Sequence, residues 1–281
     1  MPFTLSHPAA VLPLMRRPFS RTALVAGAVA PDLPYFLATA GLPVSAQSWY
    51  EPFLNATTTH GISGVPAVTL PYALLLWALL WSARRPLASL LPVPVPVPVP
   101  APMPPVPPVA SGVAVRRAGW IVLSALTGIA THLVWDAFTH VDGFVVTRTP
   151  WLTATLAGSL TWARALQHAS TIGGLAAIAA HLWRRRDRLL TALGPARTRS
   201  EDAPRRRFPL AAVLFTALCT VVGAVAQVWR WHVGPEADTA GPPPGVLLEG
   251  VLSDAAKGAG AGLIAALALY VLAWWIRRAA S

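Results

Sequence analysis

The stretch GWIVLSALTGIATHLVWDAF, residues 119–138, decides the fold class of this chain. It is as long as the ~20 mainly apolar residues that a helix needs to cross the ~30 Å hydrocarbon core of a bilayer. Two of its residues, His132 and Asp136, are ionisable, and ionisable groups are costly to place within a membrane. The stretch therefore predicts a membrane-spanning helix that also carries chemically active side chains.

Further segments of similar length and character occur along the chain, at residues 65–83, 166–183, 209–229 and 258–276. A sixth, residues 22–41, is interrupted by Pro31-Asp32-Leu33-Pro34, which prevents a continuous helical hydrogen-bond ladder. We expect this first segment to be broken or re-entrant. The sequence predicts an all-α, polytopic membrane helix bundle of about six membrane segments.

The amino-acid composition supports the membrane assignment and indicates which kinds of partner the protein contacts. Hydrophobic residues make up 54% of the chain and charged residues 12%, whereas soluble domains carry about 25% charged residues. The net charge of +11 comes from arginines that flank apolar segments and do not line one face. We therefore expect membrane lipid as a partner, and no nucleic acid.

The basic residues also predict an orientation. Of the 22 Lys and Arg residues, only Arg148, Arg164, Arg230 and Lys257 fall on one side of the alternating path through the predicted segments, and the others fall on the opposite side. The positive-inside rule places the arginine-rich loops and the C-terminus in the cytoplasm. The predicted location is the cell membrane, with multiple passes.

We interpret residues 1–281 as a single membrane domain with two cytoplasmic loops inside it. Residues 86–115 form a Pro-rich linker, whose Val-Pro repeat favours polyproline II and excludes a helix. We interpret it as a spacer, and a binder of this Pro-rich loop is the alternative. Residues 184–208 form a basic loop, which we expect to contact anionic lipid head groups.

Histidines and aspartates gather on one predicted helix face. His132, Asp136 and His140 follow the spacing i, i+4, i+8, which places them on one face of a helix. The predicted path of the chain brings His60 and His168 to the same non-cytoplasmic end of the bundle as this face. It places Asp32 at a depth similar to that of His132. His7 can join them if residues 5–15 form a half-helix that dips into the membrane. Six metal ligands are predicted: His7, Asp32, His60, His132, Asp136 and His168.

Imidazole and carboxylate ligands together suit a divalent metal, with Zn²⁺ expected and Mn²⁺ or Fe as alternatives. Such a metal would lower the pKa of a coordinated water. Asp136 and His140 are the predicted catalytic residues, and a carboxylate outside the ligand set would act as general base or orient a histidine. The alternative interpretation is structural, because a histidine near a helix end is often only hydrogen-bonded and an intramembrane Asp can simply join two helices.

Two groups outside this cluster receive structural interpretations. His181 and His232 lie near or beyond the ends of predicted segments. Gly258, Gly260 and Gly262 are typical of a close-packing helix surface. We do not expect a phosphate loop there, because no strand precedes these glycines and no Lys-Ser/Thr follows them.

Several boxes carry a resemblance to a known family. They are MPFTLSHPAA (1–10), GAVAPD (27–32), THLVWDAFTH (131–140) and QHAST (167–171). With these boxes the chain resembles bacterial integral membrane proteins of domain-of-unknown-function family 4184, over most of its length. That resemblance implies a fold class and no activity.

The chain also has a looser similarity to membrane-bound metal-dependent hydrolases and, more distantly, to proteins of the zinc-dependent phospholipase C type. The similarity lies in the order of an early His, a Pro-Asp box, a Thr-His box and a later His-x3-Asp. The matching positions are His7, Asp32, His60, His132 and Asp136. This similarity implies hydrolysis of a phosphoester or lipid-like substrate near the outer leaflet. The chain departs from the pattern by its extra His140 and by its long proline linker.

Two other classes of function remain alternatives. A broken helix with an Asp at mid-depth facing histidines is also found in proton- or metal-coupled transporters, although the two halves of the chain show no clear inverted repeat. In a non-catalytic membrane scaffold, the same His/Asp face would only hold helices together.

Overall fold

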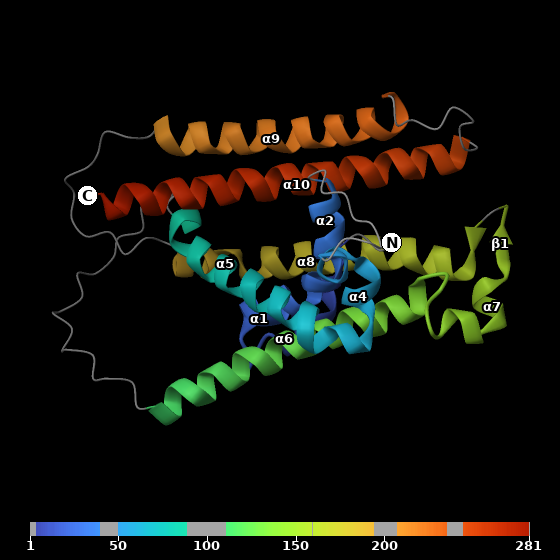
Figure 1. The fold of residues 1–281 in the computed structure, drawn as a ribbon, viewed down its shortest axis with the longest axis horizontal. Helices are drawn as coiled ribbons and strands as arrows, with labels where there is room; N and C mark the ends of the chain where they lie inside the picture. Colours follow the sequence, from blue (N-terminus) through green and yellow to red (C-terminus); the bar gives the residue numbers. More distant parts are fainter. Residues whose placement is uncertain are drawn as a thin grey trace. The chain divides into compact units, whose positions relative to one another are not determined.

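The computed structural model describes residues 4–39, 50–88, 111–158, 160–193, 207–234 and 244–280. The N-terminal half contains η1 (Thr4–Leu14), α1 (Arg21–Val29), η2 (Ala30–Asp32), α2 (Leu33–Thr39), α3 (Glu51–Leu54), α4 (Ala56–His60), η3 (Ile62–Gly64), η4 (Val65–Thr69) and α5 (Leu70–Ala88) (Figure 1). The C-terminal half contains α6 (Ser111–Thr139), η5 (Val146–Arg148), α7 (Pro150–Thr153), β1 (Thr155–Ala157), β2 (Leu160–Thr161), α8 (Trp162–Leu193), α9 (Arg207–His232) and α10 (Pro244–Ala279).

The chain forms two compact units. The first contains residues 1–33, 55–81 and 100–189, and the second contains residues 34–54, 82–99 and 190–281. Each unit is made of three separate stretches of the chain, and α5 is divided between the two units. The interpretation of residues 1–281 as a single domain stays a prediction.

Four of the described helices are long and apolar enough to cross a membrane, which indicates a membrane protein. They cover Ile62–Leu87, Gly112–Thr139, Ala211–His232 and Gly250–Ala279, and they include four of the six predicted segments. The predicted segment 166–183 lies within α8, and 22–41 covers α1, η2 and α2. Neither is among these four helices, so six membrane segments and a re-entrant first segment stay predictions.

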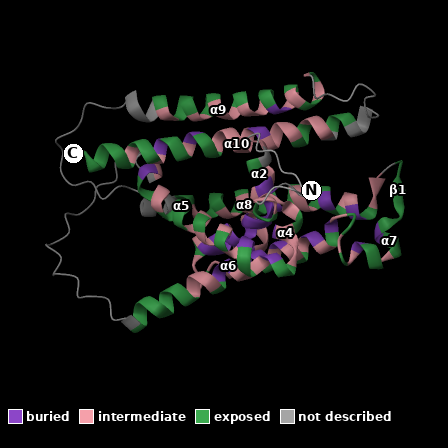
Figure 2. Cartoon of the chain, viewed as in Figure 1, coloured by how far each residue is buried: buried purple, intermediate pink, exposed green. Residues whose placement is uncertain are grey.

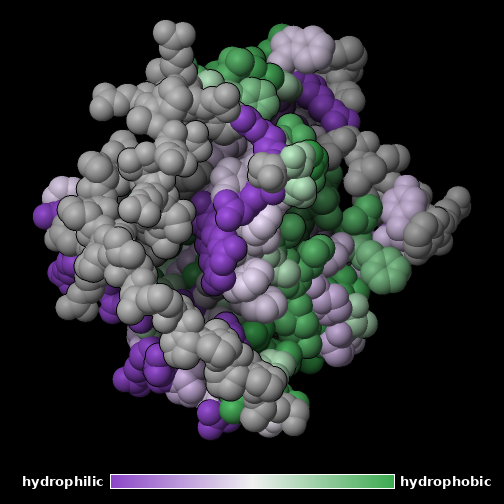
Figure 3. Space-filling view, turned by 90° about the vertical axis from the view of Figure 1, so that its left-hand side faces the viewer, coloured by the Kyte–Doolittle hydropathy of each residue, from purple (hydrophilic) through white to green (hydrophobic). Residues whose placement is uncertain are grey.

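The apolar surface of these helices is largely uncovered. Only 6% of the most apolar window of α9 is buried within the chain, and Leu218, Val221 and Val225 on α9 are each about 60% exposed. Figure 2 shows α9 mostly in the exposed and intermediate colours, and Figure 3 shows hydrophobic side chains gathered into broad areas of the face it draws. Such a surface is stable in lipid and unfavourable in water.

The first unit is built around the packing of α1 against α6. A Cβ added to Gly27 would collide with the backbone of Ala125, and one added to Gly128 would lie 2.7 Å from the Ala28 nitrogen. The two backbones can therefore approach only because both positions lack a side chain. The start of α1 is joined to α6 as well, because the Ser20 backbone N–H donates to Ser124 Oγ at 2.9 Å.

The remaining elements of the first unit surround this pair. The 3₁₀ helix η1 packs on both α1 and α6, and its Val11 forms a buried cluster with Leu24 and Ala28. On the other side, Ala30 and Ile129 belong to a second buried cluster that Ala73 of α5 completes. Buried residues are concentrated where α1, α4 and α6 meet (Figure 2).

In the second unit, α9 and α10 lie side by side (Figure 1). A Cβ on Gly258 would meet the Gly223 backbone, and one on Gly262 would meet the Cys219 backbone. The predicted close-packing surface is therefore confirmed at these two glycines, whereas a Cβ on Gly260 would meet the ring of Phe36. His232 joins the same two helices, because its Nε2 lies 3.0 Å from Asp254 Oδ2.

Some features differ from the sequence interpretation or lie outside the described residues. A short antiparallel ribbon of β1 and β2 was not predicted, and Gly158 at its turn has a φ of +56°, which favours glycine. The basic segment predicted as a loop over 184–208 begins as helix, since α8 continues to Leu193. Most of the Pro-rich linker, residues 89–110, lies outside the described residues.

The close approach of α1 and α6 predicts opposite effects for two alanine substitutions on α6. We expect Gly128→Ala to destabilise the protein by roughly 1–3 kcal/mol, because the new methyl group must displace the α1 backbone. Gly119→Ala is the matched control, because no atom lies within 4 Å of its added Cβ, and alanine is the better helix former. Thermal unfolding in detergent measures both, and equal midpoints would contradict the packing.

Candidate metal centre

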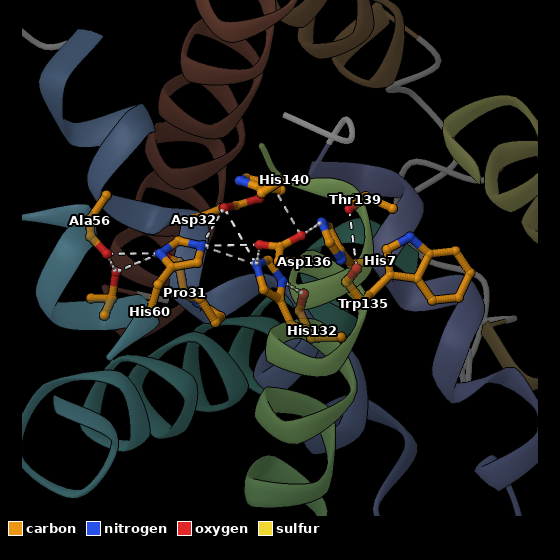
Figure 4. A network of polar contacts seen from close by, with 12 residues as sticks. His7, Pro31, Asp32, Ala56, His60, His132, Trp135, Asp136, Thr139 and His140 are labelled. Carbon is orange, nitrogen blue, oxygen red and sulfur yellow. Dashed lines mark hydrogen bonds and ion pairs between the residues drawn. The ribbon is translucent and has the colours of Figure 1, made fainter. Parts of the chain in front are cut away.

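Asp136, on the last turns of α6, lies at the centre of a cluster of histidines (Figure 4). The helical spacing brings His132 Nε2 to 3.1 Å from Asp136 Oδ2. His140 follows the last residue of α6, and its Nε2 lies 3.3 Å from Asp136 Oδ1. The predicted common face of these three residues is therefore present in the structure.

Two residues from other elements complete one side of the cluster. Asp32 ends the 3₁₀ turn η2, and His60 ends α4. His60 Nε2 lies 3.3 Å from Asp32 Oδ1 and 3.4 Å from Asp136 Oδ2, and His132 Nε2 lies 3.6 Å from Asp32 Oδ1. Residues far apart in sequence thus bring four ligand atoms together.

His7 of η1 approaches from the other side of Asp136. Its Nε2 lies 3.6 Å from Asp136 Oδ1, and its ring stacks on that of His132 with centroids 3.8 Å apart and planes inclined by 20°. His7 is only 3% exposed. The N-terminal 3₁₀ helix therefore delivers a buried imidazole to the cluster.

A buried pair of threonines holds η2 and α4 at the cluster. Thr59 Oγ1 donates to the Pro31 carbonyl at 2.7 Å, and Thr69 Oγ1 donates to the Thr59 carbonyl at 2.9 Å. Both threonines are fully buried. These bonds position Asp32 and His60, and their role was missed in the sequence, where the position of Thr59 directly before His60 is the only signal.

Two backbone carbonyls determine which imidazole nitrogen faces the carboxylates. His132 Nδ1 lies 2.8 Å from the Ala28 carbonyl, and His60 Nδ1 lies 2.8 Å from the Ala56 carbonyl. A carbonyl oxygen only accepts, so each Nδ1 must carry the proton. In the neutral rings the lone pair is then on Nε2, and the two Nε2 atoms face each other at 3.3 Å.

The centre of the cluster consequently brings two buried carboxylates against imidazole nitrogens. Both carboxylate oxygens of Asp32 and of Asp136 are buried, and imidazole nitrogens lie 3.1–3.6 Å from Asp32 Oδ1 and from both oxygens of Asp136. Buried carboxylates require a counter-charge or a metal. Ligand atoms at ~2.0–2.2 Å around one tetrahedral ion are about 3.3–3.6 Å apart, and the contacts of His60 and His132 with Asp32 and Asp136 are 3.1–3.6 Å.

Protonation provides the compensating charge when no metal is bound. Burial alone would lower the pKa of His60, but the neighbouring carboxylates of Asp136 and Asp32 outweigh it and raise that pKa to about 10. Burial and the adjacent His132 lower the pKa of His7 to about 4. A metal that binds His60 must therefore displace a proton, whereas His7 already offers a neutral imidazole at pH 7.

Two overlapping groups of these residues could hold a metal ion. One comprises His7, His132 and Asp136, and the other comprises Asp32, His60 and His132, with the ligand atoms of each group all within 4.8 Å of one another. Five of the six predicted ligands are thereby brought together. The sixth, His168, belongs to neither group and is exposed on α8, whereas its neighbour Gln167 is buried.

Comparison with known proteins places the chain in a family. A family model described as a domain of unknown function (DUF4184) matches residues 1–272, and the chain belongs to that family. No curated protein matches it, and no solved structure matches it.

Metal removal should change the stability of this protein. A bound cation present at 100 times its Kd stabilises the folded state by about 2.7 kcal/mol, so we expect a chelator to lower the unfolding temperature and added Zn²⁺ to restore it. His132→Ala should abolish this response, whereas the exposed His168→Ala should keep it. Thermal unfolding in detergent is the measurement, and identical transitions of wild type with chelator and with Zn²⁺ would contradict a metal centre.

Proposed function

We propose that this member of the DUF4184 family is a metal-dependent hydrolase that acts on a phosphoester or lipid-like substrate near the outer leaflet of the cell membrane. The observation that carries the proposal is the convergence of the His60 and His132 Nε2 atoms with the buried oxygens of Asp32 and Asp136, at 3.1–3.6 Å. Zn²⁺ fits the two-imidazole, two-carboxylate set, with Mn²⁺ or Fe as alternatives. When bound, the ion would polarise the scissile group and activate water.

The protein supplies orientation around that ion. The Ala28 and Ala56 carbonyls hold His132 and His60 in the tautomer that ligates through Nε2. Such outer contacts also raise the basicity of the ligand. Because both carbonyls belong to helices that pack near the cluster, the ligands are preorganised before substrate arrives.

Asp136 and His140 form the side of the site that we assign to the reacting atoms. The His140 side chain is 20% exposed, whereas that of His132 is fully buried. The buried Nε2 of His140 lies 3.3 Å from Asp136 Oδ1. We therefore assign these two residues to the side of the site where the scissile group and the attacking water would lie.

The position of the cluster supports an amphiphilic substrate. Asp136 lies one turn before the end of the apolar helix Gly112–Thr139, the depth at which a spanning helix leaves the hydrocarbon and meets the head groups. Phe138 and Val141 beside it are 49% and 76% exposed, and Ile62 after His60 is 85% exposed. A substrate with an apolar tail and an ester near its head group would meet these surfaces.

Hydrolysis by detergent-purified, Zn²⁺-loaded protein tests this function. The substrates are a chromogenic phosphodiester and a dispersed diacyl phospholipid. We expect Asp136→Asn to lower kcat/KM by more than about 100-fold, because the loss of contacts even outside the ligand shell costs 10–100-fold. His168→Ala is the control that keeps activity.

Turnover that persists in Asp136→Asn would contradict the assignment. Metal-loaded wild type without hydrolysis of either substrate would also contradict it. Uptake of ions into proteoliposomes by such an inactive protein would favour a transporter instead.

A further inference from the structure

We infer that the cluster holds two divalent cations, bridged by the Asp136 carboxylate, with His7 and His140 as the ligands of the second. This inference rests on the proposed metal centre and deepens it, because it assigns ligand roles to two histidines that the first ion does not use. It also narrows the chemical class of the substrate.

The two oxygens of Asp136 face different pairs of histidines. Oδ2 is 3.1 Å from His132 Nε2 and 3.4 Å from His60 Nε2. Oδ1 is 3.3 Å from His140 Nε2 and 3.6 Å from His7 Nε2. Figure 4 shows Asp136 between these residues. A carboxylate with ligands gathered at each oxygen is arranged as a bridge between two ions.

The ligand count separates the two positions. Asp32 Oδ1, His60, His132 and Asp136 Oδ2 supply four atoms, the number that a tetrahedral Zn²⁺ takes. His7 and His140 are then left over, with their Nε2 atoms directed at the other oxygen of Asp136. Together with that oxygen they make three ligands, the number typical of a catalytic ion that keeps one position open for water or substrate.

The second group, His7, His140 and the Oδ1 atom of Asp136, is largely shielded from solvent, so water does not compensate its polar atoms. His7 is 3% and Asp136 is 8% exposed. Asp136 Oδ1 and His140 Nε2 are buried atoms, and they lie 3.3 Å apart. Buried polar atoms are nearly always satisfied, and a cation between Oδ1, His7 and His140 satisfies both.

Charge then indicates the substrate class. One divalent cation would only neutralise the two carboxylates of Asp32 and Asp136. Two cations leave the centre with an excess of about two positive charges, at the side where His140 is partly exposed. Two ions at about 3.5–4 Å stabilise the attacking and leaving oxygens of a phosphoryl group, so the second ion favours an anionic phosphoester over a neutral carboxylic ester.

The number of bound ions tests the inference without an activity assay. Full-length protein in detergent is loaded with Mn²⁺, freed of excess ion and analysed for Mn per chain and by electron paramagnetic resonance. We expect two Mn²⁺ per wild-type chain with the spectrum of a coupled pair. His140→Ala should retain one ion and lose the coupling, and the exposed His168→Ala should match wild type.

Each result decides between the two proposals. One Mn²⁺ in both wild type and His140→Ala would overturn the second ion while the single-ion centre stands. No tightly bound Mn²⁺ or Zn²⁺ in wild type would overturn both. If His140→Ala fails to fold, His140→Gln replaces it, and a coupled pair that persists in this variant would overturn the role of His140.

Discussion

The hydrogen bond from His132 Nδ1 to the Ala28 carbonyl is the contact on which the cluster depends. It requires the α1 backbone to lie against α6, and that approach is possible only because Gly27 and Gly128 lack side chains. Gly128 is one helical turn before His132, so the same close contact that packs the helices also orients the imidazole. Helix packing and ligand preorganisation are therefore one property of this interface.

The buried negative charge of Asp32 and Asp136 favours the binding of a cation in the cluster. Two carboxylates withdrawn from water and surrounded by imidazoles held by carbonyls form a site whose energy is lowest when a positive charge lies among them. A proton on His60 satisfies part of that demand, and a divalent ion satisfies more of it. Competition between the two links metal affinity to pH.

Local spacing made part of the site predictable. The shared face of His132, Asp136 and His140 follows from helical periodicity, and the apolar lengths of four helices follow from composition. His168 was expected in the cluster from topology alone, but it is exposed on α8. The rotation of α8 about its own axis decides which of two adjacent side chains is buried, and at this position the buried side chain is Gln167.

The sequence by itself determined that this is a helical membrane protein and that its histidines and aspartates lie in a few boxes, because these properties depend on residue type and spacing within one segment. Only the tertiary structure decided which oxygen of Asp136 faces which histidines, which carbonyls hold the imidazoles and how Thr59 and Thr69 secure Asp32 and His60. Those features depend on contacts between segments up to 104 residues apart, and no local pattern encodes the distances between such segments.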